Sequence, residues 1–259
     1  MQRELSASDS GWETMAKRDI TISTEDGEAK AGLFAAEGPS TGRPGVILYM
    51  DAFGPRPALD AMAERLAAAG HVVLVPDLFY RAAPYGPFDP ATGFTNADSR
   101  AQLMALMGGT TAAMTEADTA AFLAALADAG VRGKIGTVGY CMGGPRALIA
   151  AAAYPDRIAA AASFHGGGLA SDAPDSPHAR VGTVKGRVYV GSAGVDGSFP
   201  PEQSARLARA LREAEIDHVI ENYVGMAHGW TVPDSRVFDA GGAERHWKRL
   251  LTFFEESLH

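Results

Sequence analysis

The sequence lacks several features that would assign the protein to other classes. It has one cysteine among 259 residues, which excludes an intrachain disulfide and a cysteine-cluster metal site. A lone cysteine favours a reducing compartment over intermolecular pairing. Met1 to Ile20 contains no apolar segment of the kind that a secretory signal requires. The longest apolar run, Ala147 to Tyr154, is far too short to span a bilayer. These absences predict a soluble, cytoplasmic protein.

Motifs for nucleotide and metal binding are absent as well. The chain has no Walker loop, no G-x-G-x-x-G and no H-E-x-x-H. Its formal net charge of −8 at pH 7 argues against nucleic acid or an anionic membrane as a partner. We therefore expect no cofactor, no metal, no nucleic-acid partner and no membrane partner.

Apolar, β-rich segments alternate with helical patterns along most of the chain. Segments 19–24 and 29–35 flank a turn sequence and predict an antiparallel hairpin. The alternation that follows predicts an α/β fold, with a mostly parallel central sheet and helices on both faces. Further strands are expected at 45–50, 71–75, 135–138, 158–164, 187–191 and 218–223. Helices are expected at 58–69, 97–108, 113–129, 146–154, 201–213 and 243–257.

The domain organisation follows from length and from the lack of linkers. A chain of 259 residues fits one large domain or two small ones. No internal repeat, low-complexity tract or interdomain linker divides the sequence, so we expect one domain over 1–259. The polar segment 1–17 is expected to be a loose N-terminal arm, and 78–96, rich in Pro, Gly and aromatics, a long loop at the rim of a site.

One short segment carries the strongest chemical signal. Gly139-Tyr-Cys141-Met-Gly143 lies between an expected strand and an expected helix, and has the G-x-nucleophile-x-G pattern with cysteine as the nucleophile. Small residues are needed two positions either side, because a larger side chain would collide with the strand or the helix. The turn would place the sulfur at a helix N-terminus, where the helix dipole favours the thiolate. The alternative is a buried structural cysteine in an ordinary turn.

In a parallel α/β sheet the chemistry is expected at the carboxyl ends of the strands. Asp196 and His228 each follow an expected strand, and with Cys141 they give the order nucleophile, acid, histidine. His228 would take the thiol proton, and Asp196 would orient the imidazole. Asp172, Asp175 and Asp217 are poorer candidates for the acid, because they lie in a loop or at a strand start.

A reaction at a carbonyl also needs donors for the oxyanion. The backbone N–H of Met142, directly after the nucleophile, is expected to supply one of them. That of Ala52, in the loop after the strand at 45–50, is expected to supply the other.

These residues resemble the dienelactone hydrolases (carboxymethylenebutenolidases), cysteine-triad members of the α/β-hydrolase superfamily. The resemblance runs from Ala31 to the C-terminus. It is carried by Gly139-Tyr-Cys-Met-Gly-Gly144, by Asp196 with Pro200, by Ala227-His-Gly229 and by Pro76-Asp-Leu-Phe79. It implies an α/β-hydrolase fold and a triad of Cys141, Asp196 and His228.

The resemblance also bears on the residues around the triad. The family places a glutamate where this chain has Asp51, and that glutamate engages the resting thiol until substrate binds. Asp51 is thus a candidate gate for the thiol, or else only orders the oxyanion loop. The family holds the substrate carboxylate with two arginines. Arg81 stands where one would be, and Val232 replaces the other, which favours a less anionic or bulkier ester or lactone.

The remaining candidates for substrate contact are Phe53, Tyr85, His165 and Trp230, which follow strands or lie in the aromatic loop. Ordinary packing at the rim is the alternative for each aromatic residue. Arg81 could instead be a solvated charge or pair with Asp77 or Asp89. Helical spacing predicts that Met104, Met107 and Met114 fill the core.

The sequence therefore predicts a cofactor-free hydrolase of small esters or lactones that forms a thioester acyl-enzyme on Cys141. It would act as a monomer or small homo-oligomer. A thioesterase or a small peptidase could use the same triad, and a non-catalytic binding module is a third alternative.

Overall fold

The computed structural model describes residues 15–259 of the chain. Its first strand, β1 (Met15–Thr24), begins inside the segment expected to be a loose arm. Met15 to Lys17 are therefore part of the sheet, because they pair with the end of β2 (Gly27–Ala36). The rest of the expected arm, 1–14, lies outside the described residues.

The core of the fold is an eight-stranded sheet with the order β1-β2-β4-β3-β5-β6-β7-β8. β1 pairs with β2 and β2 with β4 in antiparallel fashion, and all other neighbouring strands are parallel. The predicted hairpin and the mostly parallel sheet are both present. The other strands are β3 (Gly45–Tyr49), β4 (Val72–Pro76), β5 (Ile135–Tyr140), β6 (Ile158–Phe164), β7 (Arg187–Val195) and β8 (His218–Ala227).

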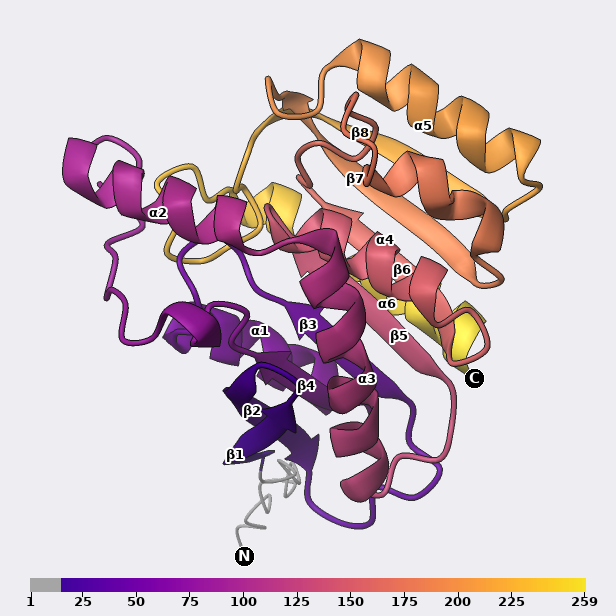
Figure 1. The fold of residues 1–259 in the computed structure, drawn as a ribbon. Helices are drawn as coiled ribbons and strands as arrows, with labels where there is room; N and C mark the ends of the chain where they lie inside the picture. Colours follow the sequence, from indigo (N-terminus) through magenta and orange to yellow (C-terminus); the bar gives the residue numbers. More distant parts are fainter. Residues whose placement is uncertain (1–14) are drawn as a thin grey trace, which may run out of the picture.

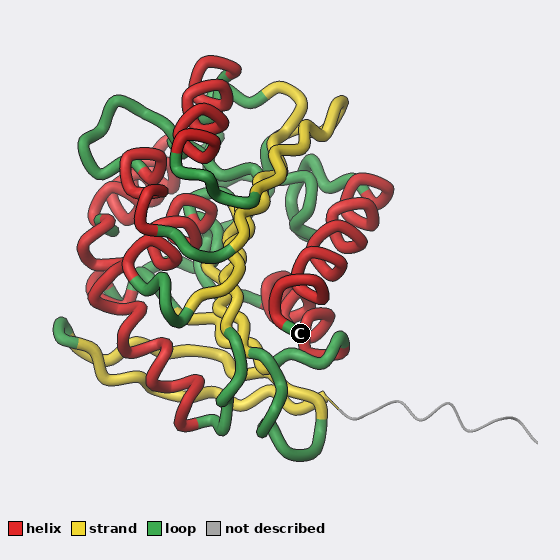
Figure 2. Tube along the Cα trace, turned by 90° about the vertical axis from the view of Figure 1, so that its right-hand side faces the viewer, coloured by secondary structure: helices red, strands yellow, loops and turns green. Residues whose placement is uncertain are grey.

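Helices cover both faces of this sheet, as Figures 1 and 2 show. α3, α4 and α5 lie on one face, and α1 and α6 lie on the other, where Arg65 of α1 pairs with Glu244 of α6. The helices are α1 (Pro57–Ala68), α2 (Ala97–Gly109), α3 (Ala112–Asp128), α4 (Gly143–Ala153), α5 (Pro201–Glu213) and α6 (Ala240–Leu258). Two short 3₁₀ helices are η1 (Tyr80–Ala82) and η2 (Pro177–Thr183).

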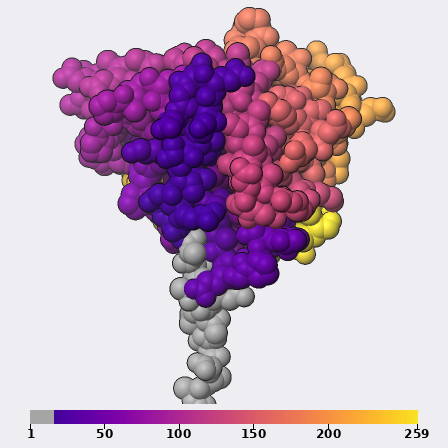
Figure 3. Space-filling model, turned by 60° about the horizontal axis from the view of Figure 1, so that its bottom comes forward, coloured from indigo at the N-terminus to yellow at the C-terminus, as the bar shows by residue number. Residues whose placement is uncertain are grey.

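The central strands explain why the fold could be predicted from apolar runs. Every residue of β3, β4 and β5 is buried, since helices pack on both faces of the parallel part. The N-terminal hairpin is different, because the side chains of Lys17 to Asp19 are exposed. Figure 3 shows this hairpin, in indigo, at the surface between later segments of the chain. No helix among the described residues is long and apolar enough to cross a membrane.

The elements near the carboxyl edge of the sheet run further than the sequence patterns predicted. β8 continues to Ala227 through Gly225, whose φ is 83°, and its pairing with β7 shifts register between Ala193 and Val195. α4 begins at Gly143 rather than Arg146, because the turn after β5 passes directly into the helix.

That turn leaves no room for side chains on either flank. A Cβ added at Gly139 would lie 1.9 Å from the Gly143 carbonyl oxygen. One added at Gly143 would lie 2.3 Å from the carbonyl oxygen of Tyr49 in β3. Cys141 between them has a φ of 55°, in the left-handed region that non-glycine residues rarely adopt. The chain therefore needs glycine at both positions to present Cys141 above the sheet.

We expect Gly139→Ala to lower the free energy of unfolding by at least about 4 kcal/mol, because the new Cβ clashes with backbone that cannot move away. Gly108→Ala is the matched control. Gly108 lies in α2, and a Cβ added there would have no atom within 4 Å, so alanine should stabilise by about 0.5 kcal/mol through helix propensity. Urea unfolding measures both, and equal midpoints for the two variants would contradict the steric argument.

Candidate active site

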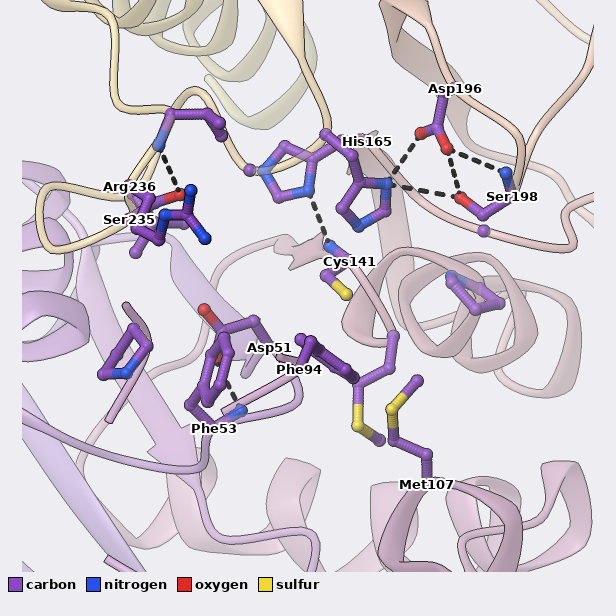
Figure 4. A pocket seen from close by; sticks show the side chains of 18 of the residues that line it. Asp51, Phe53, Phe94, Met107, Cys141, His165, Asp196, Ser198, Ser235 and Arg236 are labelled. Atoms are coloured by element: carbon purple, nitrogen blue, oxygen red, sulfur yellow. Dashed lines mark hydrogen bonds and ion pairs between the residues drawn. The ribbon is translucent and has the colours of Figure 1, made fainter. Parts of the chain in front are cut away.

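The carboxyl ends of five adjacent strands meet around one cavity of about 710 Å³. Asp51, Cys141, His165, Asp196 and His228 follow β3, β5, β6, β7 and β8 in that order, and all five line the cavity. Figure 4 shows Cys141 and His165 side by side, with Asp196 and Ser198 further along the same wall. The structure thus brings together the three residues of the predicted triad.

Asp196 and His228 form a charged pair at the site. The distance from His228 Nδ1 to Asp196 Oδ2 is 2.7 Å. Asp196 Oδ1 accepts hydrogen bonds from the backbone N–H and the hydroxyl of Ser198, at 2.8 and 2.6 Å. Burial alone would raise the pKa of Asp196, but the hydrogen bonds from His228 and Ser198 outweigh it and lower that pKa to about 2. The aspartate is therefore ionised at neutral pH.

The pKa of His228 moves in the opposite direction. Burial lowers it, but hydrogen bonding to Asp196 and Cys141 and the negative charge of both partners raise it to about 10. The imidazole can therefore hold a proton at neutral pH. An imidazolium between a carboxylate and a cysteine sulfur is the arrangement that favours a thiolate.

Cys141 is half-buried at the start of α4, and its backbone is held by two acceptors on the neighbouring strand end. Its N–H donates to the carbonyl oxygen of Phe164 at 3.2 Å and to His165 Nδ1 at 3.1 Å. His165 Nε2 lies 2.9 Å from the hydroxyl of Thr231. Because Nδ1 accepts, the neutral ring carries its proton on Nε2 and donates to Thr231.

His165 is suited to remain neutral in this position. Burial and the nearby charge of His228, whose ring centre is 5.0 Å away, hold the pKa of His165 well below 6.5. A protonated ring could not accept the Cys141 N–H. His165 lines the cavity as predicted, and its two nitrogens are used to fix the nucleophile turn.

Two backbone N–H groups after β3 and β5 have no acceptor among residues 15–259. They belong to Ala52, in the turn after β3, and to Met142, directly after Cys141. Both residues are buried. Paired, unused N–H donors beside a nucleophile are what an oxyanion hole requires.

The Asp51 carboxylate is hydrogen-bonded to groups other than the Cys141 thiol. Its two carboxylate oxygens accept hydrogen bonds from Arg56, at 2.6 and 2.8 Å, and Oδ1 also accepts the backbone N–H of Phe53 at 3.0 Å. Of the two roles left open by the sequence, this geometry matches ordering of the 51–54 loop.

Of the expected substrate contacts, Phe53 lines the cavity, whereas Arg81, Tyr85 and Trp230 are not among its lining residues. Arg81 binds the buried Asp118 through two nitrogens and pairs with Asp26, not with Asp77 or Asp89. Tyr85 donates to Asp77 at 2.6 Å.

Trp230 lies behind the cavity wall. Its side chain is fully buried, and its ring packs on Tyr223 and His165, 4.8 and 5.2 Å between centres. It supports the wall from behind and does not face the cavity.

Several residues of the cavity wall were not predicted from the sequence. Met107, expected in the core with Met104, lines the cavity, while Met104 is 53% exposed. α2, which carries both, has Leu103 as its one fully buried residue. Ser198, two residues after Asp196, has the spacing of an aspartate-turn partner, which was the available signal. The other missed residues are Arg56, Pro90, Pro145, Arg146, Gly167, Gly168, Gly229, Ser235, Arg236 and Val237.

Within 15–259, no three histidine, cysteine, aspartate or glutamate side chains are grouped so as to hold an ion. The chemistry that the arrangement can perform is thus that of a thiol, an imidazole, a carboxylate and two amide donors.

The sequence matches one known protein family and several of its members. A model of the dienelactone hydrolase family matches residues 31–258. A carboxymethylenebutenolidase of Rhodococcus opacus is 26% identical over 218 residues, covering 82% of this chain and 81% of that protein. A carboxymethylenebutenolidase homolog of Mus musculus is 28% identical over 187 residues, 71% of this chain and 69% of that one.

Solved structures show the same fold. A dienelactone hydrolase-like promiscuous phosphotriesterase from metagenomic libraries superposes with a TM-score of 0.78 at 23% identity. The match covers 95% of this chain and 99% of that one.

The depressed pKa of Asp196 predicts a pH-dependent contribution to stability. Because its pKa falls from 3.8 to about 2 on folding, the stabilisation is present above 3.8 and is lost as the pH falls toward 2. We expect Asp196→Asn to cost about 2 kcal/mol more at about pH 5 than at about pH 2. His228 is protonated throughout this window. Denaturant unfolding measures the difference, with the exposed Asp128→Asn as control, and a cost independent of pH would contradict the argument.

The position of Arg81 predicts a structural role. The Asp118 side chain is 3% exposed, so Arg81→Met leaves a buried carboxylate without its cation. We expect a loss of about 3 kcal/mol in unfolding free energy. The double variant Arg81→Met/Asp118→Asn should regain part of it, because no buried charge remains. Thermal and urea unfolding test both, and a double variant less stable than the single one would disprove this account.

Proposed function

Since the chain belongs to the dienelactone hydrolase family of the α/β-hydrolase superfamily, and is a hydrolase of that kind acting on a small molecule, we propose that it cleaves small esters or lactones with Cys141, His228 and Asp196 as its catalytic triad. Cys141 is the nucleophile, His228 the general base and acid, and Asp196 the residue that orients the imidazole.

In the first half of the proposed reaction, Cys141 Sγ bonds to the carbonyl carbon. The carbonyl oxygen becomes an oxyanion that accepts hydrogen bonds from the N–H groups of Ala52 and Met142. Collapse of this intermediate breaks the carbon–oxygen bond to the leaving group. His228 passes its proton to the departing alkoxide, and a thioester remains on the enzyme.

In the second half, His228 takes a proton from water, whose oxygen attacks the thioester carbon. The carbon–sulfur bond breaks, the acid is released, and the imidazolium and thiolate of the starting state are restored. A lactone would follow the same steps with its ring opened, so that alcohol and acid leave as one molecule.

The observation that carries this proposal is the 2.7 Å pair of Asp196 and His228 beside Cys141, in one cavity. The pKa of His228, raised to about 10 by Asp196 and Cys141 against the effect of burial, supports an imidazolium next to the sulfur. The unused N–H groups of Ala52 and Met142 support acyl chemistry over a purely structural cysteine.

The cavity wall supports a substrate with an apolar acyl or alkyl group. Phe53, Phe94, Met107, Met142 and Val232 supply much of it. The one arginine at a position where the family holds a carboxylate, Arg81, is bound to Asp118 and Asp26, and Val232 stands at the other. We therefore propose uncharged esters or lactones ahead of carboxylate-bearing ones.

The experiment is to measure hydrolysis of a panel by wild type, Cys141→Ala and Cys141→Ser. The panel holds p-nitrophenyl acetate and butyrate, an uncharged lactone, a carboxylate-bearing lactone, an acyl thioester and a peptide p-nitroanilide. We expect the esters and the uncharged lactone to react fastest, and Cys141→Ala to lose more than about 1000-fold, since its nucleophile is gone.

Mass spectrometry of the wild type, quenched during turnover of p-nitrophenyl acetate, should show one added acetyl group on the peptide containing Cys141. Equal rates in wild type and Cys141→Ala would disprove the cysteine mechanism. A strong preference for the thioester or the anilide would point instead to a thioesterase or a peptidase that uses the same residues.

A further inference from the structure

Arg56 uses all five of its N–H donors at the wall of the cavity. Nε donates to Asp234 at 2.7 Å, and Nη2 donates to Asp234 and to Asp51, both at 2.8 Å. Nη1 donates to Asp51 at 2.6 Å and to the carbonyl oxygen of Gly54 at 3.2 Å. A guanidinium has five donors in a fixed planar fork, so none is left over here.

The chain around Arg56 is built to hold this position. Pro55 and Pro57 flank it, and a residue before proline is restricted to extended backbone. Arg56 has φ −166° and ψ 169°, directly before α1 begins at Pro57. Its side chain is 12% exposed, and its guanidinium lies 5.4 Å from the centre of the Phe53 ring.

Arg56 joins two segments that both contribute to the candidate site. Asp51 directly precedes Ala52, one of the two proposed oxyanion donors. Asp234 lies 178 residues from Arg56, in the segment between His228 and α6. The guanidinium therefore links the loop after β3 to the loop that follows the proposed base.

The more consequential effect of Arg56 is on the charge of the cavity wall. Asp51 lines the same cavity as Cys141 and, without a cation, would add an unpaired negative charge to the wall of the cavity that holds the thiolate. A neighbouring carboxylate disfavours ionisation of such a group. Arg56 binds both oxygens of Asp51 and offsets its charge, so the carboxylate repels a thiolate less and is not free to accept the thiol proton.

We propose that Arg56 is a positioning residue that keeps Cys141 ready to react before substrate arrives, by holding and neutralising Asp51 at the cavity wall. This inference rests on the proposed role of Cys141 as the nucleophile. On this proposal, a salt bridge outside the triad sets the resting state of the Cys141 thiol.

The test uses the rate at which iodoacetamide alkylates the protein at neutral pH without substrate. Cys141 is the one cysteine of the chain, so the rate reports this thiol alone. We expect Arg56→Met to slow alkylation about tenfold, because Asp51 is left unpaired beside the sulfur. The double variant Arg56→Met/Asp51→Asn should return to within about threefold of wild type, because the charge is gone.

Rescue by a second substitution separates this role from a merely structural one. If Arg56 only held the loops together, removing Asp51 as well could not restore the thiol, and the double variant would be as slow as the single one. That result, or a wild-type rate in Arg56→Met, would overturn the proposal.

Arg187→Met is the matched control. Arg187 also bridges two carboxylates, Asp217 and Glu256, and lies over a phenylalanine ring, but at the opposite end of β7. Its removal should leave the alkylation rate unchanged. If Arg56→Met does not fold by circular dichroism, Arg56→Lys replaces it. A lysine has three donors in place of five and lacks the planar fork that binds both oxygens of each carboxylate, so we expect slower alkylation that Asp51→Asn restores.

The alkylation test and the hydrolysis test can fail independently of each other. Hydrolysis that survives in Cys141→Ala would remove the proposed function. The alkylation series would still report whether Arg56 controls the thiol.

Discussion

The carboxyl edge of the sheet depends on one steric constraint, the close approach of the turn after β5 to β3 and to the first turn of α4. Backbone there lies within about 2 Å of where a Cβ of residue 139 or 143 would be, so two glycines are required. The strained φ of Cys141 is accommodated because its N–H is held by Phe164, the last residue of β6, and by His165, which follows it.

The charged side chains at the cavity that holds Cys141 form two groups. His228 and Asp196 form the inner pair, and their opposite pKa shifts to about 10 and about 2 are two descriptions of one interaction. Arg56 with Asp51 and Asp234 forms an outer group in which two carboxylates share one cation. Between them His165, whose pKa is held far below 6.5 mainly by burial, stays neutral and adds no charge. The thiol is thus surrounded by groups whose protonation is already decided near neutral pH.

How much of the structure can be predicted from the sequence depends on how far apart the interacting residues lie along the chain. Buried strands appear as apolar runs, so the alternation of β3 to α6 could be predicted, and with it the strand ends that carry Cys141, Asp196 and His228. Partners distant in sequence could not be predicted. Arg81 finds Asp118 37 residues away and Asp26 55 away, and Arg56 finds Asp234 178 away. Trp230, two residues from His228, turns inward because Tyr223 and His165 offer it an aromatic surface.

The weak anchoring of α2 has an evolutionary consequence. This helix and the segment before it contribute Pro90, Phe94 and Met107 to the cavity, yet Leu103 is the one residue of α2 that is fully buried. The residues that perform the chemistry lie on strand ends that tolerate little change. Substitutions on the outer wall cost the fold little, so selection can reshape the range of accepted molecules while the reaction centre stays constant. Divergence within such a lineage would therefore concentrate between 90 and 107.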